Sequence, residues 1–294
     1  MNARSQAAFT EGSVLRHVLV MTATGSVGLV AVFAVDALNL FYISRLGVAE
    51  LAAAVGFAGI VMFMTTSFAI GLTVATSALT ARAIGQRDRE RAAMLGGTSL
   101  LLTLAVSTVV AAVLFPFLRP MLQLLGATGT TLDLATFFMQ IVLPSGPALA
   151  VGMAASGILR AAGDARRAMY VTLGAALAAA IFDPILIFLL DLRLTGAAIS
   201  TVISRFVLLA IGFHGASSVH RLVATPNRET LSLSVRPFFA IAFPAIMTQL
   251  ATPFGNAFVT RSIAGFGDAA VAGWAIIGRV VAVAFGAVFA LSGA

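Results

Sequence analysis

Two aspartates in apolar surroundings are the residues whose type and placement point to chemistry. Asp36 lies in V-A-V-F-A-V-D-A-L-N-L-F-Y, with no charged residue after it until Arg45, and Asp183 lies in A-I-F-D-P-I-L. An ionised side chain at the centre of a bilayer costs at least ~2.5 to 3.5 kcal/mol, so a carboxylate in such a segment is a functional candidate by default. A carboxylate in this position can bind a cation or take up a proton.

The composition identifies the class of protein around these carboxylates. Hydrophobic residues make up 60% of the chain and charged residues 10%, and the mean hydropathy is +1.04. A soluble domain normally has about 25% charged residues, so the composition predicts an all-α polytopic membrane protein. The net charge of +7 is explained by arginine-rich cytoplasmic loops rather than by nucleic-acid binding. The absence of cysteine excludes disulfides and Cys-based metal sites.

The apolar segments define the expected helices and domains. A spanning helix needs roughly 20 apolar residues, and the segments that reach this length are 15–44, 52–81, 93–117, 133–158, 168–190, 195–215, 235–262 and 269–294. We expect a six-helix lobe over 1–214, a cytoplasmic linker over 215–234, and the first two helices of a second, truncated lobe over 235–294.

Arginine placement predicts the orientation in the membrane. With a cytoplasmic N-terminus, the inner side carries Arg4, Arg16, Arg82, Arg87, Arg89, Arg91, Arg160, Arg166, Arg167, Arg221, Arg228 and Arg236. The outer side carries only Arg45, Arg119, Arg193 and Arg261. Because cytoplasmic loops are enriched in Lys and Arg, the sequence predicts a multi-pass protein of the bacterial plasma (inner) membrane whose N-terminus is cytoplasmic.

This orientation places the two aspartates at one depth. Asp36 and Asp183 each precede the outer end of an inside-to-outside helix by a similar number of residues, so the rise of ~1.5 Å per residue puts both in the outer half of the membrane. Two carboxyl groups at one depth can share a cation or a proton. The alternative is that each is a structural hydrogen-bonding residue between packed helices.

Further residues are candidates for lining a cleft or bending its helices. Proline removes a backbone donor and disturbs the preceding turn, and freed carbonyls at membrane depth can help to coordinate an ion. These candidates are Asn39, Pro144, Pro184, Arg205, Gln249 and Asn256. For Arg205 two roles remain open, neutralisation of Asp183 and repulsion of a cationic substrate; Arg279 is the other charge expected at membrane depth. His17, His214 and His220 show no metal-ligand spacing.

Segments of the chain repeat at an offset of 220 residues. L-G-V-A-E-L-A at 46–52 aligns with F-G-D-A-A-V-A at 266–272, and Asp36 aligns with Asn256. A repeat after six spans indicates a parallel duplication, with two six-helix bundles and a site between them.

The chain resembles the N-terminal two-thirds of a multidrug and toxic compound extrusion (MATE) transporter, within the larger flippase-exporter superfamily. The resemblance covers essentially the whole chain, and G-I-L-R-A-A-G-D-A-R-R-A-M is its most specific part. The matching segments are Asp36 with Arg45–Ala54, Gly71–Arg91, Gly157–Met169, Phe182–Pro184 and Gly196–Thr201.

The resemblance implies an exporter that uses a Na+ or H+ gradient to expel organic, often cationic, drugs through a cleft between two lobes. Asp36 would bind the coupling ion from outside with help from Asp183, and neutralising the pair would release a bound cation outward. Two features depart from the family. Met21–Gly25 lacks the proline often found there, and Ala179 replaces an asparagine that many relatives place one turn before Asp183.

The sequence thus predicts an antiporter for small organic cations with no cofactor other than the coupling ion, embedded in membrane lipid and monomeric at full length. A lipid-intermediate flippase of the same superfamily and a non-transporting fragment are the alternatives. An enzyme is not expected, because the sequence shows no nucleophile-and-base constellation.

Overall fold

The computed structural model describes residues 23, 27, 30–31, 34–35 and 37–284. Residues 37–44 are helical, and the described chain continues through helices that bear short 310 (η1, η2) and π (η3, η4) segments. The elements are α2 (Ala49–Gly85), α3 (Arg89–Leu114), η1 (Phe115–Phe117), α4 (Leu118–Leu124), α5 (Gly129–Val142), η2 (Leu143–Ser145), α6 (Gly146–Ala161), α7 (Ala165–Pro184), η3 (Ile185–Leu189), α8 (Arg193–His214), η4 (Gly215–Val219), α9 (Arg228–Ala264) and α10 (Asp268–Ala284).

The predicted spanning segments are confirmed where the structure describes them. Six helical stretches are long and apolar enough to cross a membrane: Ala49–Gly85, Arg89–Leu124, Gly129–Ala161, Ala165–Leu189, Arg193–Val219 and Thr230–Ala264. The described part of α10 has 17 residues, somewhat short of the ~20 that a span needs. Most of the first predicted helix and the last ten residues lie outside the described residues.

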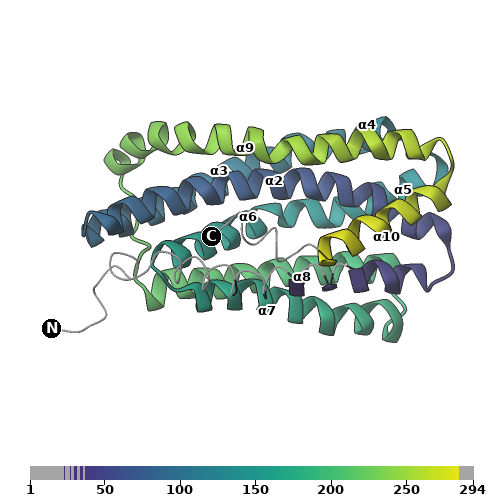
Figure 1. The fold of residues 1–294 in the computed structure, drawn as a ribbon, viewed down its shortest axis with the longest axis horizontal. Coiled ribbons are helices and arrows are strands. Elements are labelled where there is room, and N and C mark those ends of the chain that lie inside the picture. The colour runs from purple at the N-terminus through teal and green to yellow at the C-terminus, as the bar shows by residue number, and fades with distance from the viewer. Residues whose placement is uncertain (1–22, 24–26, 28–29, 32–33, 36, 285–294) are drawn as a thin grey trace.

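The helices lie side by side along the long axis of the molecule (Figure 1), which gives the bundle two ends. The end with the turns at 45–48, 125–128, 190–192 and 265–267 is called the Arg-poor end here. The turns at 86–88 and 162–164 and the segment 220–227 lie at the opposite, Arg-rich end. Helices from both predicted lobes therefore meet at each end.

Helix α2 is the centre of the bundle. It contacts α3, α5, α6, α9 and α10, and residues such as Ala53, Ala54 and Ala58 on it are fully buried. Lipid tails are as apolar as a leucine side chain, so helices in a membrane associate through close packing, which small residues permit. The alanine- and glycine-rich sequence of α2 therefore lets several helices pack against it.

Prolines mark the positions where three of the spanning stretches depart from regular α-helix. Pro116 lies in η1, Pro144 lies in η2, and Pro184 ends α7 directly before η3. Each proline lacks the N–H that would bond to the carbonyl four residues earlier, and local 310 or π turns accommodate the freed groups. The helix irregularities expected at Pro144 and Pro184 are thus present.

Two matching glycines support the predicted repeat. Gly47 has φ of 73° and precedes α2, and Gly267 has φ of 93° and precedes α10. Their 220-residue separation is the offset of the sequence repeat. A positive φ is readily adopted by glycine and rarely by other residues, so both copies use the same residue for the same turn. The described chain is one six-helix lobe followed by the start of a second, pseudo-repeated one.

The segment after α8 is docked on the six-helix lobe. Helix continues through η4 to Val219 and resumes at Arg228, so the non-helical part is 220–227 and helices extend into both ends of the expected linker 215–234. The Ala224 N–H donates to the Ala93 carbonyl at 3.0 Å. A Cβ on Gly97 would lie 1.8 Å from the Ala224 carbonyl oxygen, so α3 accommodates this backbone only because the position is glycine.

A polar contact also ties this segment to the α6–α7 turn. Asp164 accepts from a ring nitrogen of His220 at 2.9 Å and from the Arg167 guanidinium, and it caps α7 by accepting from the Arg167 N–H at 3.0 Å. Burial raises the pKa of Asp164, but these bonds outweigh it and hold the pKa below its ordinary value.

We expect Gly97→Ala to displace the 220–227 segment and to destabilise the protein by about 1–3 kcal/mol, because the added methyl group overlaps the Ala224 carbonyl. The measurement is the temperature at which half of the detergent-solubilised protein stays monodisperse. Gly255→Ala is the control, since a Cβ there meets nothing within 4 Å. Equal midpoints for the two variants would contradict the docking of the segment.

We expect Asp164→Asn to lower stability by about 1 kcal/mol at pH 7, because asparagine keeps the helix cap but loses the charge that Arg167 and His220 contact. A carboxyl whose folded pKa is lowered stabilises the fold above its unfolded pKa of about 3.9 and loses that contribution as pH falls through the folded pKa. The difference from wild type should therefore shrink below about pH 4. Asp88→Asn, at a cap that accepts only from the Arg91 N–H among the described residues, should show no such difference.

Candidate functional site

Asp36, the first of the predicted pair, lies outside the described residues. The helical residues that follow it are placed against the segment after Asp183. The ring of Tyr42 packs edge-on against that of Phe188 in η3, with ring centroids 5.6 Å apart. Leu40 and Ile43 belong to the same buried cluster as Ile187 and Ala197. The 37–44 helix thus lies beside η3 and α8 at the Arg-poor end.

Asp183 is buried in the interior of the six-helix lobe. Its exposed fraction is 1%, although it lies in a stretch apolar enough to span a membrane. Pro184 follows it at the end of α7, and the π turn η3 begins at the next residue. The aspartate therefore sits where regular helix gives way, as the sequence predicts.

The antiparallel packing of α7 on α8 determines the position of Asp183 along the bundle axis. Gly196 approaches the Leu186 carbonyl, and Gly174 approaches the Ile211 side chain. Between these two contacts the helices run antiparallel, so residues of α7 and α8 can be matched by their position along the bundle axis. Asp183 then lies about opposite Ser200, and Arg205 about opposite Ala179. Arg205 thus lies about one helical turn from Asp183 along the bundle.

Arg205 bonds to the helix break between α5 and α6. Its side chain is buried, and Nη1 donates to the Val142 carbonyl at 2.9 Å and to Ser145 Oγ at 3.0 Å. The Ser145 hydroxyl in turn donates to the Val142 carbonyl at 2.6 Å. A buried guanidinium needs such acceptors, because leaving its donors unsatisfied costs more than the bonds contribute.

The break supplies these acceptors because its backbone bonds are rearranged. The Gly146 N–H donates to the Leu143 carbonyl instead of to Val142, four residues earlier. The Val142 carbonyl is thus available to Arg205, which ties α8 to the break. Sequence reasoning missed Ser145 as a partner of Arg205, because P-S-G-P signals the helix break but not this contact.

The other candidates are distributed over two sides of the bundle. Asn39, Gln249 and Pro184 are partly buried, whereas Pro144 and Asn256 are exposed. Gln249 and Asn256 lie on α9, which packs against α2 and α3 and is separated from α7 and α8 by α2 and α6 in Figure 1. The structure therefore brings Arg205 to the region of Asp183 but keeps Gln249 and Asn256 apart from it. Arg279, expected at membrane depth, is only partly buried and lies near Gly59.

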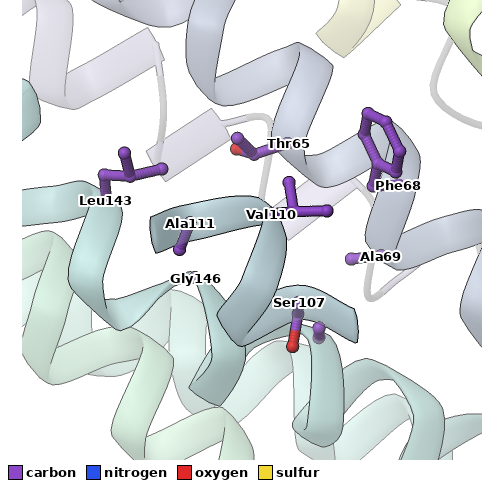
Figure 2. Close-up of a pocket in the computed structure, with 9 residues that line it drawn as sticks. Thr65, Phe68, Ala69, Ser107, Val110, Ala111, Leu143 and Gly146 are labelled. Carbon is purple, nitrogen blue, oxygen red and sulfur yellow. The ribbon is translucent and has the colours of Figure 1, made fainter. Parts of the chain in front are cut away.

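A small cavity lies beside the α5–α6 break (Figure 2). Its volume of about 20 Å³ has room for about one water molecule. The hydroxyls of Thr65 and Ser107 on its wall donate to carbonyls of their own helices. A pocket for a drug-sized molecule is typically 300–1,000 Å³, so this cavity does not accommodate an organic substrate.

Comparison with known proteins decides the family. The family model described as MatE matches residues 26–185, which is more than half of the chain. The chain belongs to the MatE family. Asp183 and the 37–44 helix both lie within the matched region.

Relatives and solved structures of the family cover nearly all of this MatE chain. It is 31% identical over 284 residues to an FAD transporter of Shewanella oneidensis, covering 94% of this chain and 62% of that protein. It is 27% identical over 254 residues to the multidrug export protein MepA of Staphylococcus aureus, covering 83% of this chain and 54% of that protein. A crystal structure of the Vibrio cholerae MATE transporter VcmN in the bent form matches with a TM-score of 0.79 at 30% identity. The match covers 94% of this chain and 63% of that one.

The chain thus spans less than two thirds of the length of these relatives. Together with the membrane-spanning helices, the relatives show a membrane protein of a transporter family.

We expect Arg205→Met to destabilise the protein by about 2–3 kcal/mol, because the Val142 carbonyl and Ser145 Oγ lose a charged donor. Ser145→Ala should cost about 1 kcal/mol. Arg193→Met on the same helix, whose ion pair with Asp191 is solvent-exposed, should change stability by less than about 1 kcal/mol. Thermal midpoints of the three variants test this order, and an Arg205 variant as stable as the Arg193 variant would contradict the assigned contact.

Proposed function

We propose that this MatE protein is a secondary active antiporter that exports organic cations in exchange for H+ or Na+ by alternating access. The observation that carries the proposal is the burial of Asp183 inside an apolar spanning stretch of a chain whose relatives include a multidrug export protein. A charged carboxyl group at that depth is costly, and such residues commonly mark the ion or proton pathways of transporters.

Asp36 is proposed as the second member of the coupling pair. It precedes Tyr42 by six residues, and Asp183 precedes Phe188 by five. Because the rings of Tyr42 and Phe188 are in contact, these similar distances support a shared depth for the two carboxyl groups. A proton or Na+ that neutralises the pair would weaken the attraction for a bound organic cation, which would then leave.

The proposed setting is the bacterial inner membrane, with the Arg-rich end in the cytoplasm. Arg89, Arg166 and Arg167 lie at that end, whereas Arg193 and Arg261 lie at the other. The protein is proposed to act as a monomer in contact with lipid, with the coupling ion in place of a cofactor.

A second candidate substrate is an anionic, nucleotide-like cofactor. The FAD transporter of Shewanella oneidensis matches 94% of this chain, and the six-helix lobe holds a buried cation in Arg205. Paired transport assays with a fluorescent organic cation and with FAD distinguish the two candidates, because the carboxylate pair should favour the cation, whereas a cofactor exporter would move FAD.

We expect Asp183→Asn and Asp36→Asn each to reduce efflux of a fluorescent organic cation at least tenfold, because neither variant can cycle between charged and neutral forms. The assay uses cells that express the complete gene product while outer pH and outer Na+ are varied separately. Asp133→Asn, at an exposed ion pair with Arg119, is the matched control and should export like wild type. Unchanged efflux and ion dependence in both carboxylate variants would refute the coupling role.

A further inference from the structure

Polar contacts join the six-helix lobe to the start of the second lobe at the Arg-poor end. Arg261, in the last turn of α9, donates through Nη1 to the Leu124 carbonyl at the end of α4, at 2.8 Å. The Thr131 hydroxyl on α5 donates to Asp268 Oδ2 in the first turn of α10, at 2.6 Å. We call these four residues the interlobe clasp.

A close backbone approach lies between these two bonds. Gly126, in the turn between α4 and α5, has φ of 101°, and a Cβ there would lie 2.5 Å from the Ala264 Cβ. Only glycine combines this backbone conformation with this approach. The α4–α5 turn is therefore shaped to receive the α9–α10 turn.

The clasp differs in chemistry from the other contacts of α9 and α10. Towards the Arg-rich end, α9 packs on α2 through apolar side chains that include Leu72, Phe238 and Ile246. Near the clasp, Val271 and Ala275 of α10 approach Gly56. Apolar packing of this kind is separated only at a cost proportional to the area exposed. The Arg261 bond is exposed and can exchange for bonds to water, whereas Thr131 is 1% exposed and meets water only once the lobes separate. Each such bond contributes about 0.5–1.5 kcal/mol.

The connectivity of the chain also suits movement at this end. The segment 220–227 is docked on α3 at the Arg-rich end, through the Ala224–Ala93 bond and the packing at Gly97. The clasp lies at the opposite end of the 37-residue helix α9. A helix anchored at one end can swing about that anchor when the clasp bonds at its other end separate together with the apolar contacts beside them, which include Ile263 and Val271.

We propose that the interlobe clasp is a gate that closes the Arg-poor end of the cleft and must open once in each transport cycle. The proposal rests on the proposed alternating-access function and adds the residues that close one side. Thr131 and Asp268 are positioning residues, because they hold the two lobes together and touch no substrate.

The test cross-links the clasp reversibly. The 294 residues contain no cysteine, so Thr131→Cys with Asp268→Cys provides a defined pair once any cysteine outside these residues is replaced by alanine. The pair is joined by a short bis-thiosulfonate reagent. Arg119→Cys with Asp133→Cys is the matched control, because that ion pair joins α4 to α5 within one lobe. A specific protease site inserted in the docked segment 220–227 allows the chain to be cut between the lobes, and on a denaturing gel only the clasp cross-link should keep the two fragments together.

The cross-linked clasp pair should lose at least nine tenths of its transport and regain it when the reagent is reduced, while the cross-linked control pair transports normally. Full transport by the cross-linked clasp pair would overturn the proposal, as would failure of the pair to cross-link.

Failure of the antiporter proposal itself would appear differently, as absent transport in untreated wild type. In that case the gate is tested by the rate at which a thiol reagent labels a single Thr131→Cys variant as outer pH and Na+ are varied. A rate that changes with the ions supports opening of the clasp, and a constant rate overturns the gate proposal.

Discussion

The hydrocarbon core of a membrane offers no hydrogen-bond partner to a charged side chain, and this constraint governs the interior of the six-helix lobe. Arg205 and Asp183 are both buried there, within stretches that are otherwise apolar. The lobe meets the demand of Arg205 with the Val142 carbonyl and the Ser145 hydroxyl. An acceptor of this kind is available because the helix is interrupted at that level, so the break at Pro144 supplies the partner that the buried charge needs.

The same constraint would connect the proposed coupling site to movement. The helix break whose acceptors bind Arg205 lies between α5 and α6, and a small cavity lies beside it. Arg205 is on α8, which packs against α7, the helix that holds Asp183. A change in the charge of Asp183 would act about one helical turn from the guanidinium that ties α8 to the break. If Asp183 binds the coupling ion as proposed, binding would change the packing of the lobe. The anchored segment 220–227 and the interlobe clasp would then allow that change to move α9.

Much of this organisation was predictable from the sequence, because hydropathy and proline act locally. The apolar spans, the irregular helices at Pro144 and Pro184, and the duplication marked by Gly47 and Gly267 all follow from residue types and spacing. The partner of Arg205 was not predictable, because Ser145 is 60 residues away and the pairing depends on how three helices pack. The docking of Ala224 against Gly97 was missed for the same reason, since a glycine in a helix does not reveal which backbone it admits.

Coupling of substrate movement to an ion through buried carboxylates can be measured with the full-length protein reconstituted in sealed vesicles. A pH gradient and a Na+ gradient are imposed one at a time, and accumulation of a labelled organic cation is followed. We expect accumulation to follow one of the two gradients, to reverse when that gradient is reversed, and to be lost in Asp183→Asn. Cation movement that ignores both gradients, or that persists unchanged in the Asp183 variant, would contradict it.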